Sequence, residues 1–82
     1  MAEKHLTVNI LSPENTVFTG NAEAVFFPGL LGNFEVLPNH APIVSSLGKG
    51  VVKVRDGGER TFEIKSGIVR IKDNVVTVCV EI

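Results

Sequence analysis

The feature that most constrains this chain is the alternation of apolar and polar residues on either side of Asp73-Asn74. Both residue types tolerate the positive φ of a type I′ turn, so they predict a two-residue hairpin turn. Pairing residue 72 with residue 75 then places on one face the β-branched residues Val69, Ile71, Val76 and Val78. A slip of one residue would expose this apolar set, so we expect a firmly fixed register.

A second hairpin is predicted further upstream by the same argument. Its inward residues would be Val52, Val54, Phe62 and Ile64. Pairing 54 with 62 and 52 with 64 keeps them on one face and leaves Gly57-Gly58-Glu59 as a three-residue loop that uses glycine. In this register Lys53 lies opposite Glu63, a cross-strand ion pair of little energetic weight if it is exposed.

The N-terminal part of the chain predicts further short strands. Residues 5–11 alternate, with apolar side chains on one face only. A break at Gly20-Asn21 is expected to separate a strand at 16–19 from one at 22–27. The latter is apolar on both faces from Ala24 onward, which predicts cover on both sides. Pro28-Gly29 then predicts a turn.

The fold class follows from these patterns. No segment shows a helical apolar period of 3.6 residues, so we expect no substantial helix. Many short strands separated by turn residues are typical of a β-sandwich or barrel. The length of 82 residues suits a single domain over residues 1–82. The sequence therefore predicts a small all-β domain.

Charge and composition exclude several classes of function. The net charge is −1, with both signs spread along the chain, whereas a nucleic-acid surface needs a basic stripe. There is no apolar run of about 18 residues, so no membrane insertion is expected. With one cysteine, Cys79, no internal disulfide is possible. His5, His40 and Cys79 show no known metal-ligand spacing, and no cofactor is expected.

One segment, residues 32–42, is neither a plain strand nor a plain turn. Pro38 and Pro42 fix their own φ and push the preceding residues towards extended geometry. Asn39 between them tolerates positive φ. We therefore expect a stiff loop at residues 37–42, anchored to the core by flanking apolar residues: Phe34, Val36, Ile43 and Val44. Such a loop is where a small β domain would place a contact site.

This segment also carries a family resemblance. Gly-x-Phe-x-Val-Leu-Pro-x-His-Ala-Pro, followed by Val44-Ser45-Ser46-Leu47 and Gly50-Val51-Val52, resembles the N-terminal β-sandwich domain of the ε subunit of F-type ATP synthases. The resemblance covers nearly the whole chain and implies about ten short strands in two sheets. Two positions depart from it: the family usually has glycine in place of Glu35 and often in place of Asn39.

The resemblance implies a non-catalytic rotor subunit that couples proton-driven rotation to ATP synthesis, peripheral to the inner face of an energy-coupling membrane. Its implied partners are the γ subunit and the c-ring, and we expect a monomer when it is isolated because the partner surface is heterologous. The implied c-ring contacts are Leu31, Gly32, Asn33 and Glu35. The implied γ-facing neighbourhood runs from His40 through Ala41 and Pro42 to Ser45. Family members usually continue into a helical hairpin that restrains ATP hydrolysis. If Ile82 is the natural end, we expect no such inhibition.

Individual residues allow alternative interpretations. His40 would either hold the loop by a local hydrogen bond or contact a partner. Leu30 and Leu31 would either fold back onto the core or form an exposed apolar tip, which the resemblance favours. Cys79 is expected on the outer face of the last strand. The outer faces mix apolar with basic residues: Val51, Ile68, Val75 and Cys79 with Lys53, Arg55, Arg70 and Lys72.

Two other classes of function are alternatives. A stand-alone ligand-binding or protein-interaction β-sandwich for carbohydrate or peptide would need exposed aromatic residues, yet the chain has no Trp or Tyr. A small enzyme using His40 would need an orienting acid and a nucleophile or metal beside that residue.

Overall fold

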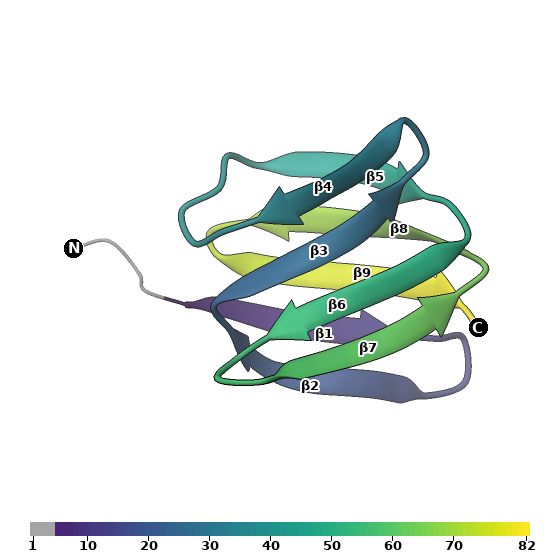
Figure 1. The fold of residues 1–82 in the computed structure, drawn as a ribbon, viewed down its shortest axis with the longest axis horizontal. Helices are drawn as coiled ribbons and strands as arrows, with labels where there is room; N and C mark the ends of the chain where they lie inside the picture. Colours follow the sequence, from purple (N-terminus) through teal and green to yellow (C-terminus); the bar gives the residue numbers. More distant parts are fainter. Residues whose placement is uncertain (1–4) are drawn as a thin grey trace.

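Nine strands follow one another along residues 5–82, the part of the chain that the computed structural model describes. In chain order they are β1 (Leu6–Leu11), β2 (Thr16–Ala22), β3 (Ala24–Gly29), β4 (Gly32–Val36), β5 (Ile43–Leu47), β6 (Gly50–Arg55), β7 (Glu59–Ile64), β8 (Ser66–Lys72) and β9 (Val75–Glu81) (Figure 1). Residues 5–82 contain no helix, and so none that is long and apolar enough to cross a membrane. The predicted all-β class is confirmed, with nine strands where the resemblance implies about ten.

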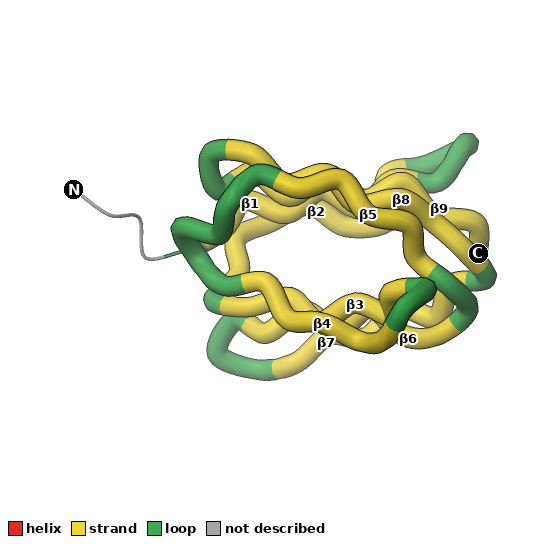
Figure 2. Tube along the Cα trace, turned by 90° about the horizontal axis from the view of Figure 1, so that it is seen from above, coloured by secondary structure: helices red, strands yellow, loops and turns green. Residues whose placement is uncertain are grey.

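The strands form two layers (Figure 2). One layer, the back sheet, has the order β2-β1-β9-β8-β5, and the other, the front sheet, contains β4, β3, β6 and β7. The layers are joined along one side where Gly29 of β3 pairs with Leu47 of β5. On the other side the rings of Phe18 and Phe62 lie 5.6 Å apart, centroid to centroid. The expected two-sheet sandwich is therefore confirmed.

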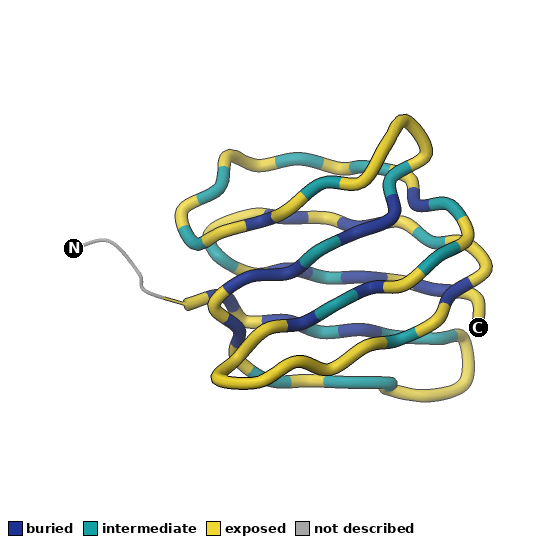
Figure 3. Tube along the Cα trace, viewed as in Figure 1, coloured by how far each residue is buried: buried dark blue, intermediate teal, exposed yellow. Residues whose placement is uncertain are grey.

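The core lies between the layers and consists of the inward-facing residues of the strands (Figure 3). These residues are almost all Val, Ile and Leu, which suit a pleated, half-buried surface. Burying one such side chain fully contributes about 1.5–3 kcal/mol. The buried cluster comprises Leu6, Val8, Ile10, Ala22, Val25, Phe27, Val36, Leu47, Val52, Val54, Ile64, Val69, Ile71, Val76, Val78 and Val80.

The β8–β9 hairpin has the register that the sequence predicts. Lys72 pairs with Val75, and Val69 pairs with Val78. The turn residues have φ values of 51° at Asp73 and 62° at Asn74, as a type I′ turn requires. The prediction is confirmed because turn chemistry and apolar alternation demand the same register here.

The predicted register of the β6–β7 hairpin is wrong by two residues. Val52 pairs with Phe62 and Val54 with Arg60, so the loop is Asp56-Gly57-Gly58. Gly57 takes the positive φ, at 75°. A shift of two preserves the face of every side chain, so the predicted inward set still faces inward. The predicted Lys53–Glu63 pair is wrong, because Lys53 lies opposite Thr61 and its Nζ is 3.7 Å from Glu59 Oε2.

Two predicted breaks are also wrong. Gly20 lies within β2, opposite Val8 of β1, and the chain leaves the sheet only at Glu23, whose N–H donates to the Arg55 carbonyl oxygen at 2.8 Å. Pro28 lies within β3, opposite Asn33 of β4. β6 pairs only with residues 24–26 of β3, so the missing N–H of Pro28 costs no bond of that ladder.

Candidate functional site

The β3–β4 hairpin ends in an exposed apolar turn, residues 30–33, here called the tip. Gly29 pairs with Gly32, and Leu30 and Leu31 form the turn between them. Leu31 is fully exposed and Leu30 is 67% exposed. Gly32 has a φ of 132°, which few other residues adopt. Of the two interpretations of these leucines, the exposed tip is confirmed.

The Pro/His loop, residues 37–42, leaves the other end of β4 and leads into β5 (Figure 1). Asn39 has a φ of 69°, which confirms the predicted position of positive φ. Val36 is buried, and Ile43 packs against the core, so both act as the expected anchors. Val44 does not: it is 71% exposed because it pairs with Arg70, and both side chains therefore face outward.

His40 makes the local hydrogen bond that was one of its two expected roles. Its Nδ1–H donates to the carbonyl oxygen of Ala41 at 2.7 Å. The imidazole is partly exposed, and Ala41 and Pro42 beside it are exposed. The ring is therefore held by backbone rather than by a carboxylate, and part of its edge is accessible to a partner.

The loop is also bonded to the β8–β9 turn, a contact that sequence reasoning missed. The backbone N–H of Asn39 donates to Asn74 Oδ1 at 2.5 Å, and Asn74 Nδ2 donates to Asn39 Oδ1 at 3.2 Å. The backbone oxygen of Asn74 accepts the N–H of Thr7 at 2.8 Å. Asn74 thus connects the loop, its own turn and the start of β1.

Ser45 lies beside the tip rather than beside His40. It is partly buried and lines a hollow together with Leu30, Leu31 and Phe34. The neighbouring Ser46 carbonyl accepts the N–H of Leu30 at 3.4 Å. The residues assigned from the resemblance therefore fall into two groups: Leu31, Gly32, Asn33 and Ser45 at one end of β4, and His40, Ala41 and Pro42 at the other.

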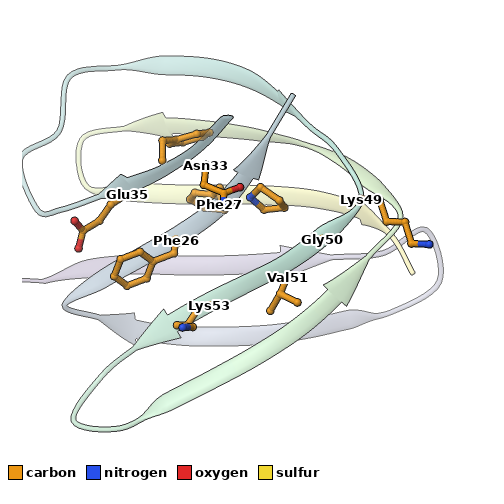
Figure 4. A pocket seen from close by; sticks show the side chains of 10 residues that line it. Phe26, Phe27, Asn33, Glu35, Lys49, Gly50, Val51 and Lys53 are labelled. Carbon is orange, nitrogen blue, oxygen red and sulfur yellow. The ribbon is translucent and has the colours of Figure 1, made fainter. Parts of the chain in front are cut away.

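Glu35 lies between these ends, on the outer face of β4. Its Oε2 is 3.8 Å from Arg55 Nη2. Arg55 and Lys53 both lie over the ring of Phe26, at 5.5 and 5.9 Å from its centroid. Figure 4 shows Phe26, Glu35 and Lys53 on neighbouring strands of this face. The basic side chains supply the cover that was predicted for the outer face of β3.

The other candidate residues lie on the outer faces. Cys79 is exposed on β9, as predicted. Ile68 and Val75 share its face of the back sheet, whereas Val51 lies on the front sheet. Within residues 5–82 no group of three His, Cys, Asp or Glu side chains is placed to hold a metal ion. Exposed residues therefore lie at both ends of β4.

Comparison with known families identifies a match over residues 5–82. The matching family is described as ATP synthase, Delta/Epsilon chain, beta-sandwich domain. The chain is similar to the ATP synthase epsilon chain of Leptospira interrogans, with 37% identity over 79 residues, which is 95% of this chain and 62% of that one. It is also similar to the epsilon chain of Bordetella petrii, with 37% identity over 89% of this chain and 53% of that one.

Solved structures show the same fold at low sequence identity. One chain in a structure of the Euglena gracilis mitochondrial ATP synthase, containing OSCP, F1 and the c-ring, aligns with a TM-score of 0.90 and 19% identity. The alignment covers 98% of this chain and 52% of that one. A chain of the Tetrahymena thermophila central stalk and c-ring aligns with a TM-score of 0.82 and 17% identity, covering 99% and 66%. The present chain spans about three-fifths of the length of the Leptospira relative.

Proposed function

Because the chain belongs to the family of ATP synthase Delta/Epsilon chain beta-sandwich domains, we propose that it acts as a non-catalytic subunit in the central stalk of an F-type ATP synthase. In this role it binds the γ subunit and contacts the c-ring, so that rotation of the ring is passed to γ. Chemistry takes place on other subunits, and this chain makes and breaks no bond. It lies peripheral to the inner face of an energy-coupling membrane and is a monomer when isolated.

The observation that carries this proposal is the placement of exposed contact residues at both ends of one strand. β4 connects an apolar tip to a proline-bounded loop, and its inward residue Val36 is buried in the core. β4 is an edge strand whose five residues all pair with β3, from Gly32 opposite Gly29 to Val36 opposite Val25. This pairing holds the two ends of β4 at a fixed separation.

The c-ring is assigned to the tip, and γ is assigned to the Pro/His loop together with Ser45 of β5. The tip, with Leu31, Gly32 and Asn33, contacts the c-ring, and Glu35 extends this surface along β4. His40, Ala41 and Pro42 contact γ, and Ser45 extends the γ surface along β5 towards the hollow beside the tip. Leu31, Ala41 and Pro42 are exposed, whereas the apolar residues of the core are buried. Their exposure supports this assignment.

The test is titration calorimetry of the chain with a γ subunit from the same source. His40→Ala and Ser45→Arg are measured singly and together, and Gly58→Ala in the distant β6–β7 loop serves as the control. Tight wild-type binding that is weakened in the double variant and unchanged in the control supports the proposal. If folded wild-type protein does not bind γ, the proposal fails, and a ligand screen on the sandwich is the next experiment.

A further inference from the structure

We propose that Asn74, in the β8–β9 turn, is a positioning residue that fixes the Pro/His loop in the conformation that meets γ. This inference rests on the proposed function for its consequence, since the loop is the assigned γ surface. The position of Asn74 in the structure supports it directly. The residue lies 35 positions along the chain from Asn39 and forms two side-chain hydrogen bonds with it.

The paired bonds restrain both the backbone and the side chain of the loop. Asn74 Oδ1 accepts the backbone N–H of Asn39, and Asn74 Nδ2 donates to the Asn39 side-chain oxygen. Only an amide side chain supplies an acceptor and a donor at these two atoms. An ionised aspartate at position 74 would accept the first bond but could not donate the second.

The turn is itself well fixed, so it can serve as a support. Asn74 has a φ of 62° in a type I′ turn between two strands whose inward residues are buried. Its backbone oxygen accepts the N–H of Thr7, which ties the turn to β1. Because the Asn74 side chain is held in this way, its bonds to Asn39 fix the loop relative to the back sheet.

The loop needs such a support because it buries little of its own surface. Leu37 is 49% exposed, and Ala41 and Pro42 are also exposed. Pro38 and Pro42 have no N–H to donate. Burial within the loop therefore does little to fix its orientation, and hydrogen bonds to the turn matter more than they would in a packed segment.

Asn39 also acquires a physical explanation. Glycine at this position would also permit positive φ but would bring no side-chain oxygen. Here asparagine keeps a φ of 69° and adds the acceptor that Asn74 Nδ2 uses. The Asn39–Asn74 pair thus makes two hydrogen bonds, and glycine at position 39 would keep only the one from the backbone N–H.

The test uses Asn74→Gly, because glycine adopts the positive φ of the turn and removes only the side-chain bonds. Asp73→Gly is the matched control: it changes the other turn residue, which also has positive φ, and keeps the Asn74 side chain that bonds to Asn39. Amide hydrogen exchange of Asn39 and affinity for γ are measured for both. Asn74→Gly is expected to raise the Asn39 exchange rate and to weaken γ binding by about tenfold each. Asn39→Gly, measured for γ binding alone, is expected to weaken it by less. Asp73→Gly should change both by less than about twofold.

The two measurements separate this inference from the proposed function. If wild-type protein does not bind γ, the proposed function fails, and the exchange measurement alone decides whether Asn74 fixes the loop. An unchanged Asn39 exchange rate in Asn74→Gly overturns the inference whatever γ does. Faster exchange with unchanged γ affinity overturns the positioning role, because the loop would then be ordered by Asn74 without consequence for binding.

Discussion

The tip and the Pro/His loop lie at opposite ends of β4, and they are held in different ways. At the tip, glycines permit a tight turn, and the side chain of Leu31 is fully exposed. In the loop, two prolines restrict the backbone, and Asn39 is bonded to Asn74 across the molecule. The tip thus has a tight turn with a freely exposed leucine side chain. The Pro/His loop is restrained by its prolines and by the Asn39–Asn74 bonds.

Under the proposed function, this difference suits the two ends to different kinds of contact. A restrained loop loses little conformational freedom on binding, so more of its interaction energy appears as affinity. An exposed leucine on a narrow turn adapts to the surface it meets and contributes mainly by burying apolar area. The loop is therefore suited to a long-lived contact. The tip is suited to a contact with the edge of another surface.

The strongest expected effect concerns the base of the tip. A Cβ added at Gly29 would lie 2.5 Å from the Gly32 carbonyl oxygen and 2.9 Å from the Phe34 ring. Because the first of these is backbone, Gly29→Ala should lower the free energy of unfolding by about 2–3 kcal/mol. Gly58→Ala is the control, since a Cβ there meets nothing within 4 Å. Urea denaturation measures both, and equal stability of the two variants would show that the tip has no rigid base.

The next effect concerns the loop. Asn39→Ala puts alanine, which tolerates positive φ less well than asparagine, at a φ of 69° and removes the bond from Asn74 Nδ2. The expected loss of stability is about 1–2 kcal/mol. Asn39→Gly relieves the backbone strain and should cost less than Ala. Thermal unfolding of the two variants checks this order, and the reverse order would contradict a loop set by positive φ at this residue.

A smaller effect is expected between the two ends. Glu35 and Arg55 form an ion pair whose side chains are 40% and 45% exposed. Solvent screens such a pair, so Glu35→Gln should change stability by less than about 0.5 kcal/mol at moderate salt. A loss well above this value in a denaturation curve would mean that Glu35 is a structural part of the strand rather than a surface residue.

The smallest effect on stability is expected at the tip itself. Leu31 is fully exposed, so Leu31→Asp removes no buried contact and should leave the melting temperature within about 2 °C of wild type. A marked loss would show that Leu31 packs onto the sandwich in solution. That result would remove the contrast between the two ends of β4.

Sequence reasoning succeeded where local chemistry determines structure. The β8–β9 register follows from two turn residues and the residues next to them. The predicted β6–β7 loop is wrong because either Asp56 or Glu59 can complete a three-residue loop with Gly57-Gly58. The alternation of apolar residues does not distinguish registers that differ by two residues. The break assigned to Gly20-Asn21 was wrong because pairing with β1 overrides the local preference of glycine for turns.

Contacts between segments that are far apart in the sequence could not be predicted. The parallel pairing of β1 with β9, the stacking of Lys53 and Arg55 on Phe26, and the Asn39–Asn74 bonds all depend on how the layers are arranged. Nothing in the local sequence around Asn74 distinguishes it from an ordinary turn residue. For the candidate site, the sequence located exposed residues at both ends of β4 but not the position of Ser45 beside the tip.

The most direct test of the account measures two variants against two partners. Leu31→Asp and His40→Ala are each titrated against γ, and the complex of each with γ is titrated against purified c-ring. The account predicts a crossover: Leu31→Asp weakens c-ring binding by about tenfold and leaves γ binding unchanged, whereas His40→Ala weakens γ binding and not c-ring binding. If both variants weaken binding of the same partner, or neither weakens binding of either, the assignment of the c-ring to the tip and of γ to the Pro/His loop is contradicted.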